Sequence, residues 1–113
     1  LSGSKILVLG VAYKQDVDDY RESPALEVIC LLKGSGAEVR FFDPFVKSFT
    51  YHGTTTSGLP ELTQAALRDT DLVVITTAHT AVDYDFVQKY ARAIFDTKNA
   101  MRYVSKRSNI ELL

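Results

Sequence analysis

The sequence is poor in cysteine and in long apolar runs. Its single cysteine, Cys30, can form neither an internal disulfide nor a cysteine-based metal site. Nothing therefore points to an oxidising compartment, and we expect a cytoplasmic protein. The longest aliphatic runs, residues 6–9 and 72–75, are far shorter than the roughly 20 apolar residues that a membrane-spanning helix needs. No membrane segment is predicted.

The chain also lacks an excess of charge of one sign. It carries 13 basic and 14 acidic residues, a net charge of -1, so there is no broad electrostatic drive toward nucleic acid or anionic lipid. Between positions 87 and 110, however, the basic residues clearly outnumber the one acid, Asp96. This stretch is typical of either a local anion site or a solvated basic tail.

Length and composition predict one folded domain over residues 1–113. The 113 residues are 46% hydrophobic and 24% charged, as in ordinary soluble domains. The chain starts at Leu1, and no signal-peptide pattern follows. We therefore expect a fragment of a longer protein.

Short apolar segments alternate with helical patterns along the chain. Ser23 and Pro24 predict a helix start, as N-cap and first helical residue, and Gly34 or Gly36 its end. Residues 45–58 have no period and predict a surface loop, and the basic C-terminal end has no regular pattern. The other predicted elements are strands at 5–9, 38–42, 72–77 and 93–96 and short helices at 60–67 and 83–91. This order predicts an α/β fold, a small doubly wound parallel sheet (Rossmann-like) with helices on both faces.

In such sheets, ligands bind beyond the carboxyl ends of the strands. After its first strand, a dinucleotide-binding fold shows G-x-G-x-x-G, whereas residues 10–15 read GVAYKQ and keep only Gly10. A self-contained NAD site is therefore not expected. Lys14 follows where backbone amides would have cradled a phosphate, and Tyr13 adds a ring and a hydroxyl. A solvated loop lysine is the alternative.

The acidic residues 16, 18, 19 and 22 do not predict a metal site. An EF-hand counted from Asp16 would need a glycine where the chain has Arg21. We expect Arg21 instead to lie among these carboxylates, fixed by charge-assisted hydrogen bonds.

The chain offers no complete catalytic constellation, and we predict no catalytic residue. His79 has no serine or cysteine nucleophile placed with it, which is typical of a loop or helix-start histidine. Cys30 lies in mid-helix next to Ile29 and Leu31, so we expect a buried structural thiol without a nucleophilic role.

Several segments taken in order carry a family resemblance. Residues 5–14 (KILVLGVAYK) are followed by 16–25 (DVDDYRESPA), then by Asp43-Pro44, 71–75 (DLVVI) and 96–99 (DTKN). This set resembles the C-terminal, UDP-sugar-binding domain of the UDP-glucose/GDP-mannose dehydrogenase family. The sequence of residues 17–24 (VDDYRESP) resembles the branch that oxidises UDP-N-acetylhexosamines more than the branch that oxidises UDP-glucose.

The resemblance implies a three-part, NAD-dependent oxidoreductase used in polysaccharide biosynthesis. Its N-terminal domain would bind most of the NAD, a central helical region would follow, and this domain would bind the UDP-sugar. The enzyme would oxidise the sugar C6 alcohol to a carboxylate through a thiohemiacetal on a cysteine outside this chain. The implied partners are the UDP-sugar, the other two domains and further copies in a homo-oligomer.

The resemblance also implies roles for four residues. Tyr13 and Lys14 would contact the UDP-sugar, with Lys14 near the diphosphate, and Lys98 would complete the nucleotide pocket. Arg21 would reach toward NAD. Arginine is usual in the family at position 98, and lysine lacks its planar two-pronged donor set.

Two other interpretations are open. A degenerate Rossmann-like module used for assembly or regulation would bind no ligand. A phospho-receiver domain would need an aspartate at the end of its third strand, where this chain has Thr76-Thr77.

Overall fold

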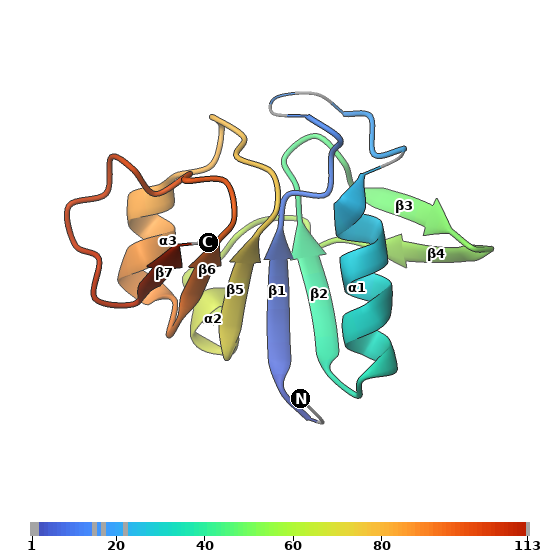
Figure 1. Cartoon of the computed structure of the whole chain (residues 1–113), viewed down its shortest axis with the longest axis horizontal. Helices are drawn as coiled ribbons and strands as arrows, with labels where there is room; N and C mark the ends of the chain where they lie inside the picture. The colour runs from blue at the N-terminus through green and yellow to red at the C-terminus, as the bar shows by residue number, and fades with distance from the viewer. Residues whose placement is uncertain (1–2, 15, 17, 22, 113) are drawn as a thin grey trace.

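Five parallel strands form the central sheet in the order β2-β1-β5-β6-β7 (Figure 1). The computed structural model describes residues 3–14, 16, 18–21, 23–112. The strands of the sheet are β1 (Lys5–Leu9), β2 (Glu38–Phe42), β5 (Leu72–Ile75), β6 (Ile94–Asp96) and β7 (Ile110–Leu112). The predicted α/β sheet is confirmed, and β7 is a further strand in the segment predicted to be irregular.

The central strand β1 is apolar on both faces because both faces are covered. Leu7 and Leu9 pack into one hydrophobic cluster and Val8 into another on the opposite face. Leu9 pairs with Phe42 of β2 and with Ile75 of β5. The carboxyl ends of these three strands are therefore level, so the loops that follow them start side by side.

Helix α1 (Pro24–Gly34) covers one face of the sheet. The Ser23 hydroxyl accepts a hydrogen bond from the Ala25 amide at 3.3 Å, and Pro24 occupies the first turn, so the predicted helix start is confirmed. Leu26 and Ile29 pack into the same cluster as Val8.

Two short helices cover the opposite face. They are α2 (Gln64–Arg68) and α3 (Tyr84–Tyr90). The range of α3 is close to the predicted 83–91, but α2 begins four residues after the predicted start at position 60, because Thr63 is its N-cap. Leu67 of α2 and Val87 of α3 are fully buried in the cluster that contains Leu7 and Leu9. Helices on both faces are thereby confirmed. Among the described residues, none of the helices has the length and apolarity needed to cross a membrane.

The prediction of a surface loop over 45–58 is wrong. Strands β3 (Ser48–Tyr51) and β4 (Thr54–Ser57) pair there as an antiparallel hairpin. His52 and Gly53 form its turn with φ +50° and +78°, and two left-handed residues suit the twist of a two-residue hairpin. Phe49 is buried against Phe41, with ring centroids 5.2 Å apart, so the hairpin packs beside α1.

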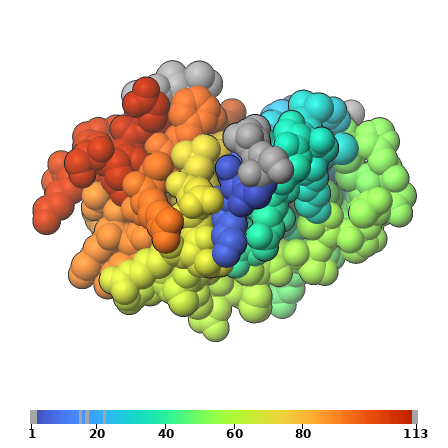
Figure 2. Space-filling model, turned by 90° about the horizontal axis from the view of Figure 1, so that it is seen from below, coloured from blue at the N-terminus to red at the C-terminus, as the bar shows by residue number. Residues whose placement is uncertain are grey.

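The view from the amino-terminal edge of the sheet shows the central place of β1 (Figure 2). Its blue start lies between the yellow segment that contains β5 and the teal segments around α1 and β2. The opposite, carboxyl edge carries the loops after β1, β2, β5 and β6, which gather at the top of Figure 1.

Candidate functional site

The chain reverses its direction of winding between β1 and β5. It runs from β1 outward to β2, then returns across β1 to β5 and continues outward to β6 and β7. Loops on either side of such a point leave the sheet in opposite directions, and ligands of doubly wound sheets bind in the crevice between them. The loops after β1 and β5 are therefore the first place to look for a site.

Backbone contact closes the base of this crevice. Gly10 has φ +90°, and a Cβ atom there would lie 2.5 Å from the Thr77 carbonyl oxygen. The Gly10 amide donates to the Phe42 carbonyl at 2.8 Å, and the Thr77 hydroxyl donates to the Ala12 carbonyl at 2.8 Å. The one glycine kept from the dinucleotide motif thus serves close packing between the loops after β1 and β5.

Asp43, directly after β2, ties two loops together. One carboxylate oxygen, Oδ2, accepts from the amides of Val11 at 2.8 Å and Ala12 at 3.1 Å. The other, Oδ1, accepts from the amides of Phe45 at 2.8 Å and Val46 at 3.1 Å. The buried carboxylate therefore fixes the loop after β1 as well as its own.

A buried histidine completes the bonding of Asp43. His79, in the loop after β5 as predicted, has no exposed surface, and its Nε2 lies 2.8 Å from Asp43 Oδ2. Burial disfavours the charged carboxylate, but hydrogen bonds from His79 and from the Phe45 and Val11 amides outweigh it and hold the pKa of Asp43 below its usual value.

The loop after β1 is also bonded to the loop after β5. The Asp16 amide donates to Nδ1 of His79 at 2.8 Å. In return, the Asp16 carboxylate accepts from the Thr80 amide at 2.7 Å and from the Thr80 hydroxyl at 2.9 Å. Sequence patterns did not indicate this network, because the hydrogen bonds from Asp16 to His79 and from His79 to Asp43 join positions 63 and 36 residues apart along the chain.

Tyr13 and Lys14 lie in the loop after β1, and both are exposed. The Tyr13 side chain is 51% exposed, and the Lys14 amine lies 5.9 Å from the centroid of its ring. Within the part of the chain that the structure describes, no carboxylate forms an ion pair with Lys14. A ring and an available cation therefore stand together at the carboxyl edge, and both can contact a ligand.

Arg21 forms a two-bond ion pair with Asp19. Its Nε and Nη2 atoms lie 3.1 Å from Oδ1 and Oδ2 of that carboxylate, and the arginine side chain is 82% exposed. The hydrogen bonds of Arg21 lower the pKa of Asp19. The predicted charge-assisted pairing is confirmed for Asp19, whereas Glu22 lies outside the described residues.

Lys98 lies in the loop after β6, where its backbone amide is bonded to Asp96, a second buried carboxylate. Asp96 at the end of β6 accepts from the amides of Lys98 at 3.0 Å, Ala100 at 3.0 Å and Met101 at 2.9 Å. The Lys98 side chain is exposed on the resulting turn. Lys98 shares the carboxyl edge with Tyr13 and Lys14, but β5 separates their strands.

A cavity of about 190 Å³ lies between the loops after β5 and β6. The Tyr84 hydroxyl beside it donates to the His79 carbonyl at 2.9 Å, and burial raises the pKa of Tyr84. On the outer side, Tyr103 is 87% exposed and carries the Arg102 guanidinium 5.0 Å from its ring centroid. The lining residues are Ala78, His79, Thr80, Tyr84, Ala100, Arg102 and Tyr103.

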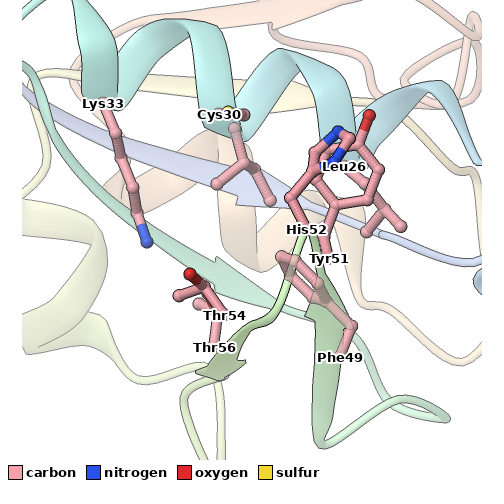
Figure 3. Close-up of a pocket in the computed structure, with 9 residues that line it drawn as sticks. Leu26, Cys30, Lys33, Phe49, Tyr51, His52, Thr54 and Thr56 are labelled. Atoms are coloured by element: carbon pink, nitrogen blue, oxygen red, sulfur yellow. The ribbon is translucent and has the colours of Figure 1, made fainter.

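A second cavity, also of about 190 Å³, lies between α1 and the β3–β4 hairpin (Figure 3). Cys30 lines it and is exposed, so the prediction of a buried thiol is wrong. Each helical residue is rotated by about 100° from the one before it. Since Ile29 faces the sheet, Cys30 is turned away from it.

No cluster of three or more potential metal ligands occurs among the described residues.

The fold defines the class of the protein, a doubly wound α/β domain with exposed polar side chains at the carboxyl edge of its sheet. Residues 7–103 match the UDP-glucose/GDP-mannose dehydrogenase family, UDP binding domain. The chain belongs to the UDP-glucose/GDP-mannose dehydrogenase family, as its resemblance implied.

Individual relatives agree with this assignment. The chain is 34% identical over 107 residues to a UDP-N-acetyl-D-mannosamine dehydrogenase from Methanococcus maripaludis, a match that covers 88% of this chain and 23% of that protein. A solved UDP-N-acetyl-mannosamine dehydrogenase from Staphylococcus aureus superposes with a TM-score of 0.67 at 34% identity, covering 100% of this chain and 25% of that one. For an NDP-N-acetyl-D-galactosaminuronic acid dehydrogenase from Methanosarcina mazei, the TM-score is 0.73 at 26% identity, with 99% and 24% covered. The chain thus spans about a quarter of the length of these relatives.

Proposed function

We propose that this chain is the UDP-sugar-binding domain of a three-part, NAD-dependent UDP-sugar 6-dehydrogenase. The parent enzyme would oxidise the C6 alcohol of the sugar to a carboxylate, with water as the added oxygen source and two NAD molecules accepting one hydride each. Family membership supports this assignment. The chain by itself would bind and orient the nucleotide without performing the oxidation.

The observation that carries the proposal is the exposed amine of Lys14, which lies beside the Tyr13 ring in a loop held by hydrogen bonds to Asp43 and His79. A diphosphate requires fixed positive charge and hydrogen-bond donors. Lys14 supplies an exposed amine with no carboxylate bonded to it in the described chain, and Tyr13 supplies a ring and a hydroxyl. We assign both residues to the UDP-sugar, with Lys14 at the diphosphate and Lys98 at the edge of the same pocket.

We assign NAD mainly to the N-terminal domain of the parent. The dinucleotide motif is incomplete here, and Gly10 is already in contact with Thr77, so little space is left for a pyrophosphate at that point. Arg21 would face NAD from this domain, since its guanidinium is largely exposed and oriented by Asp19.

The setting of the parent enzyme follows from its relatives. Five of the curated relatives are named UDP-N-acetyl-D-mannosamine dehydrogenases, which favours a UDP-N-acetylhexosamine as substrate. We further propose a homo-oligomer in contact with the NAD and central domains. Its place would be the cytoplasm, and its uronate product would enter polysaccharide biosynthesis.

Titration of UDP into the ¹⁵N-labelled chain at neutral pH tests the proposal. We expect amide chemical shifts to change at Tyr13, Lys14 and Lys98, and a parallel titration with inorganic pyrophosphate separates recognition of the diphosphate from that of uridine. If UDP at millimolar concentration moves none of these amides, the domain is an assembly or regulatory module without a ligand.

A further inference from the structure

A chain of hydrogen bonds links the base of the sheet edge to the loop that carries Tyr13 and Lys14. It runs from the Asp43 carboxylate through the His79 ring to the Asp16 amide, with both ring contacts at 2.8 Å. Asp16 is two residues after Lys14. Its backbone has φ +61°, a left-handed conformation that aspartate adopts more readily than most residues other than glycine.

The direction of each hydrogen bond in this chain is fixed. A backbone amide can only donate, so Nδ1 of His79 must be the acceptor and carry no proton. The ring proton is therefore on Nε2 and is donated to Asp43, whose carboxylate is kept ionised by its backbone donors. His79 is thus a neutral ring with both nitrogens in use.

Four segments supply titratable or charged groups near His79. Asp43, after β2, and Asp16, after β1, contact its ring. Tyr84 of α3 donates to its backbone carbonyl, and Arg102, in the loop after β6, lines the same cavity. Asp16 Oδ1 is 3.8 Å from Nδ1 and is already bonded to the Thr80 amide. A second ring proton would deprive the Asp16 amide of its acceptor, even if the carboxylate turned away from Thr80 to accept that proton.

We propose that His79 is a positioning residue for UDP-sugar binding, because its unprotonated Nδ1 holds the loop that presents Tyr13 and Lys14. The inference rests on the proposed function. Loss of this acceptor, by substitution or by a second ring proton, removes the hydrogen bond from the Asp16 amide to His79, and the affinity for the UDP-sugar then falls. Affinity is therefore measured between about pH 5 and pH 8, the range over which histidine side chains in general change charge.

Two substitutions separate the two ring nitrogens. In His79→Asn, the side-chain oxygen can replace Nδ1 as the acceptor for Asp16, but the link to Asp43 is lost. In His79→Gln, the longer amide can replace Nε2 as the donor to Asp43, but the acceptor for Asp16 is lost. Neither side chain titrates, so both variants should lose the acid dependence that the wild-type chain shows.

The measurement is the affinity for UDP-glucose across this pH range, together with the stability to urea. UDP-glucose is the probe because its doubly esterified diphosphate keeps a constant charge. Loss of one hydrogen bond corresponds to roughly two- to tenfold in affinity. We expect this loss in the wild-type chain at acid pH and in His79→Gln at every pH, while His79→Asn stays within about twofold of the wild-type value at pH 8.

Stability should follow the opposite order, because His79→Asn leaves the buried Asp43 carboxylate without its histidine donor. A merely structural role would make affinity fall together with stability. The matched control is His52→Asn, which removes the other histidine from an exposed turn where asparagine tolerates the positive φ. This variant should keep the pH dependence of the wild-type chain.

The role of His79 is overturned if His79→Asn titrates like the wild-type chain or if His79→Gln binds as tightly as the wild-type chain. If the wild-type chain binds no UDP-glucose at any pH, the proposed function itself fails, and the role of His79 in binding fails with it. The two failures are therefore distinguished by the wild-type titration alone.

Discussion

Two regions at the carboxyl edge of the sheet use charged and polar groups in opposite ways. The first, here called the clamp, consists of Gly10, Asp43, Thr77 and His79 and is buried. The second, called the rim, consists of Tyr13, Lys14, Arg21 and Lys98 and is exposed.

In the clamp, protein donors satisfy the charge, since the Asp43 carboxylate accepts from four amides and a histidine. In the rim, Lys14 keeps its charge available at the surface. The comparison shows that the clamp residues hold the loops in place, whereas the rim residues present the side chains that we propose bind the ligand. Substitutions of Gly10, Asp43 or Thr77 in the clamp should therefore change stability first, and substitutions in the rim should change affinity alone. His79 is the exception, because its ring also bonds to the loop after β1.

The largest effect is expected for Asp43→Ala. It leaves buried donors without an acceptor, and breaking such a buried pair typically costs about 3–5 kcal/mol in the free energy of unfolding. Urea unfolding measures the loss, with the exposed Asp18→Ala as control, expected within about 0.5 kcal/mol of the wild-type value. An equal loss in both variants would contradict the buried role of Asp43.

The stability of the wild-type chain and that of Asp43→Ala should respond differently to acid. The pKa of Asp43 is lowered in the folded state from an ordinary value of 3.8. Its contribution to stability is therefore complete above that value and is lost as the pH falls below it, toward the folded-state pKa. The stability difference between the wild-type chain and Asp43→Ala should accordingly shrink in acid, which urea unfolding at a series of pH values tests.

Gly10→Ala should be the next most damaging change. The new Cβ would meet the Thr77 backbone at 2.5 Å in a left-handed conformation, which together cost about 2–4 kcal/mol. Gly53→Ala is the matched control, because Gly53 also has a positive φ but no atom within 4 Å of the added Cβ. We expect about 1 kcal/mol there, from backbone strain alone. Similar losses would show that close packing at Gly10 is unimportant.

Lys14→Ala should leave stability unchanged and weaken UDP binding. Loss of a charged hydrogen bond costs about 1.5–3 kcal/mol, or roughly ten- to a hundredfold in the dissociation constant. Isothermal titration calorimetry measures it. Lys33→Ala removes the same charge from the last turn of α1, at the far edge of the sheet, and should bind UDP normally. Equal affinities for the two variants would remove Lys14 from the site.

Lys98→Arg should produce the smallest change, in the direction of tighter binding. Arginine keeps the charge and adds a planar pair of donors suited to phosphate. One added hydrogen bond corresponds to about 0.5–1.5 kcal/mol, or roughly two- to tenfold. Lys106→Arg, on an exposed part of the basic C-terminal stretch, is the control. Weaker binding by Lys98→Arg would speak against a phosphate contact at this position.

Local patterns were enough to predict most of the sheet. The apolar runs of β1 and β5 and the Ser23-Pro24 helix start are signals carried by neighbouring residues, and each was found at the expected place. The β3–β4 hairpin was missed because His52-Gly53 is an unusual turn pair and polar threonines fill β4. Strand β7 is three residues long, too short to show a period.

The rim and the clamp also differ in how far the sequence alone could predict them. The place of Tyr13 and Lys14 at the carboxyl edge could be predicted because they lie within five residues of the end of a recognisable strand, whereas their contact with a ligand stays a prediction. The clamp could not, since Asp43 and His79 lie 36 residues apart and meet only when both strands join β1. Cys30 shows the reverse error, in which apolar neighbours along the chain suggested burial although the helix turns that position outward.

The bond between Asp16 and His79 has a consequence for the order in which the molecule assembles. It joins positions 63 residues apart, across the return of the chain from β2 to β5. Contacts of such long sequence separation form slowly, because the intervening chain must first be brought together. A nascent chain in which β5 has not yet docked can complete its β1–α1–β2 unit, yet the loop after β1 lacks its hydrogen bond to His79. If this loop binds the nucleotide as proposed, recognition comes late in folding, after the chain has closed its second crossover, from β2 to β5.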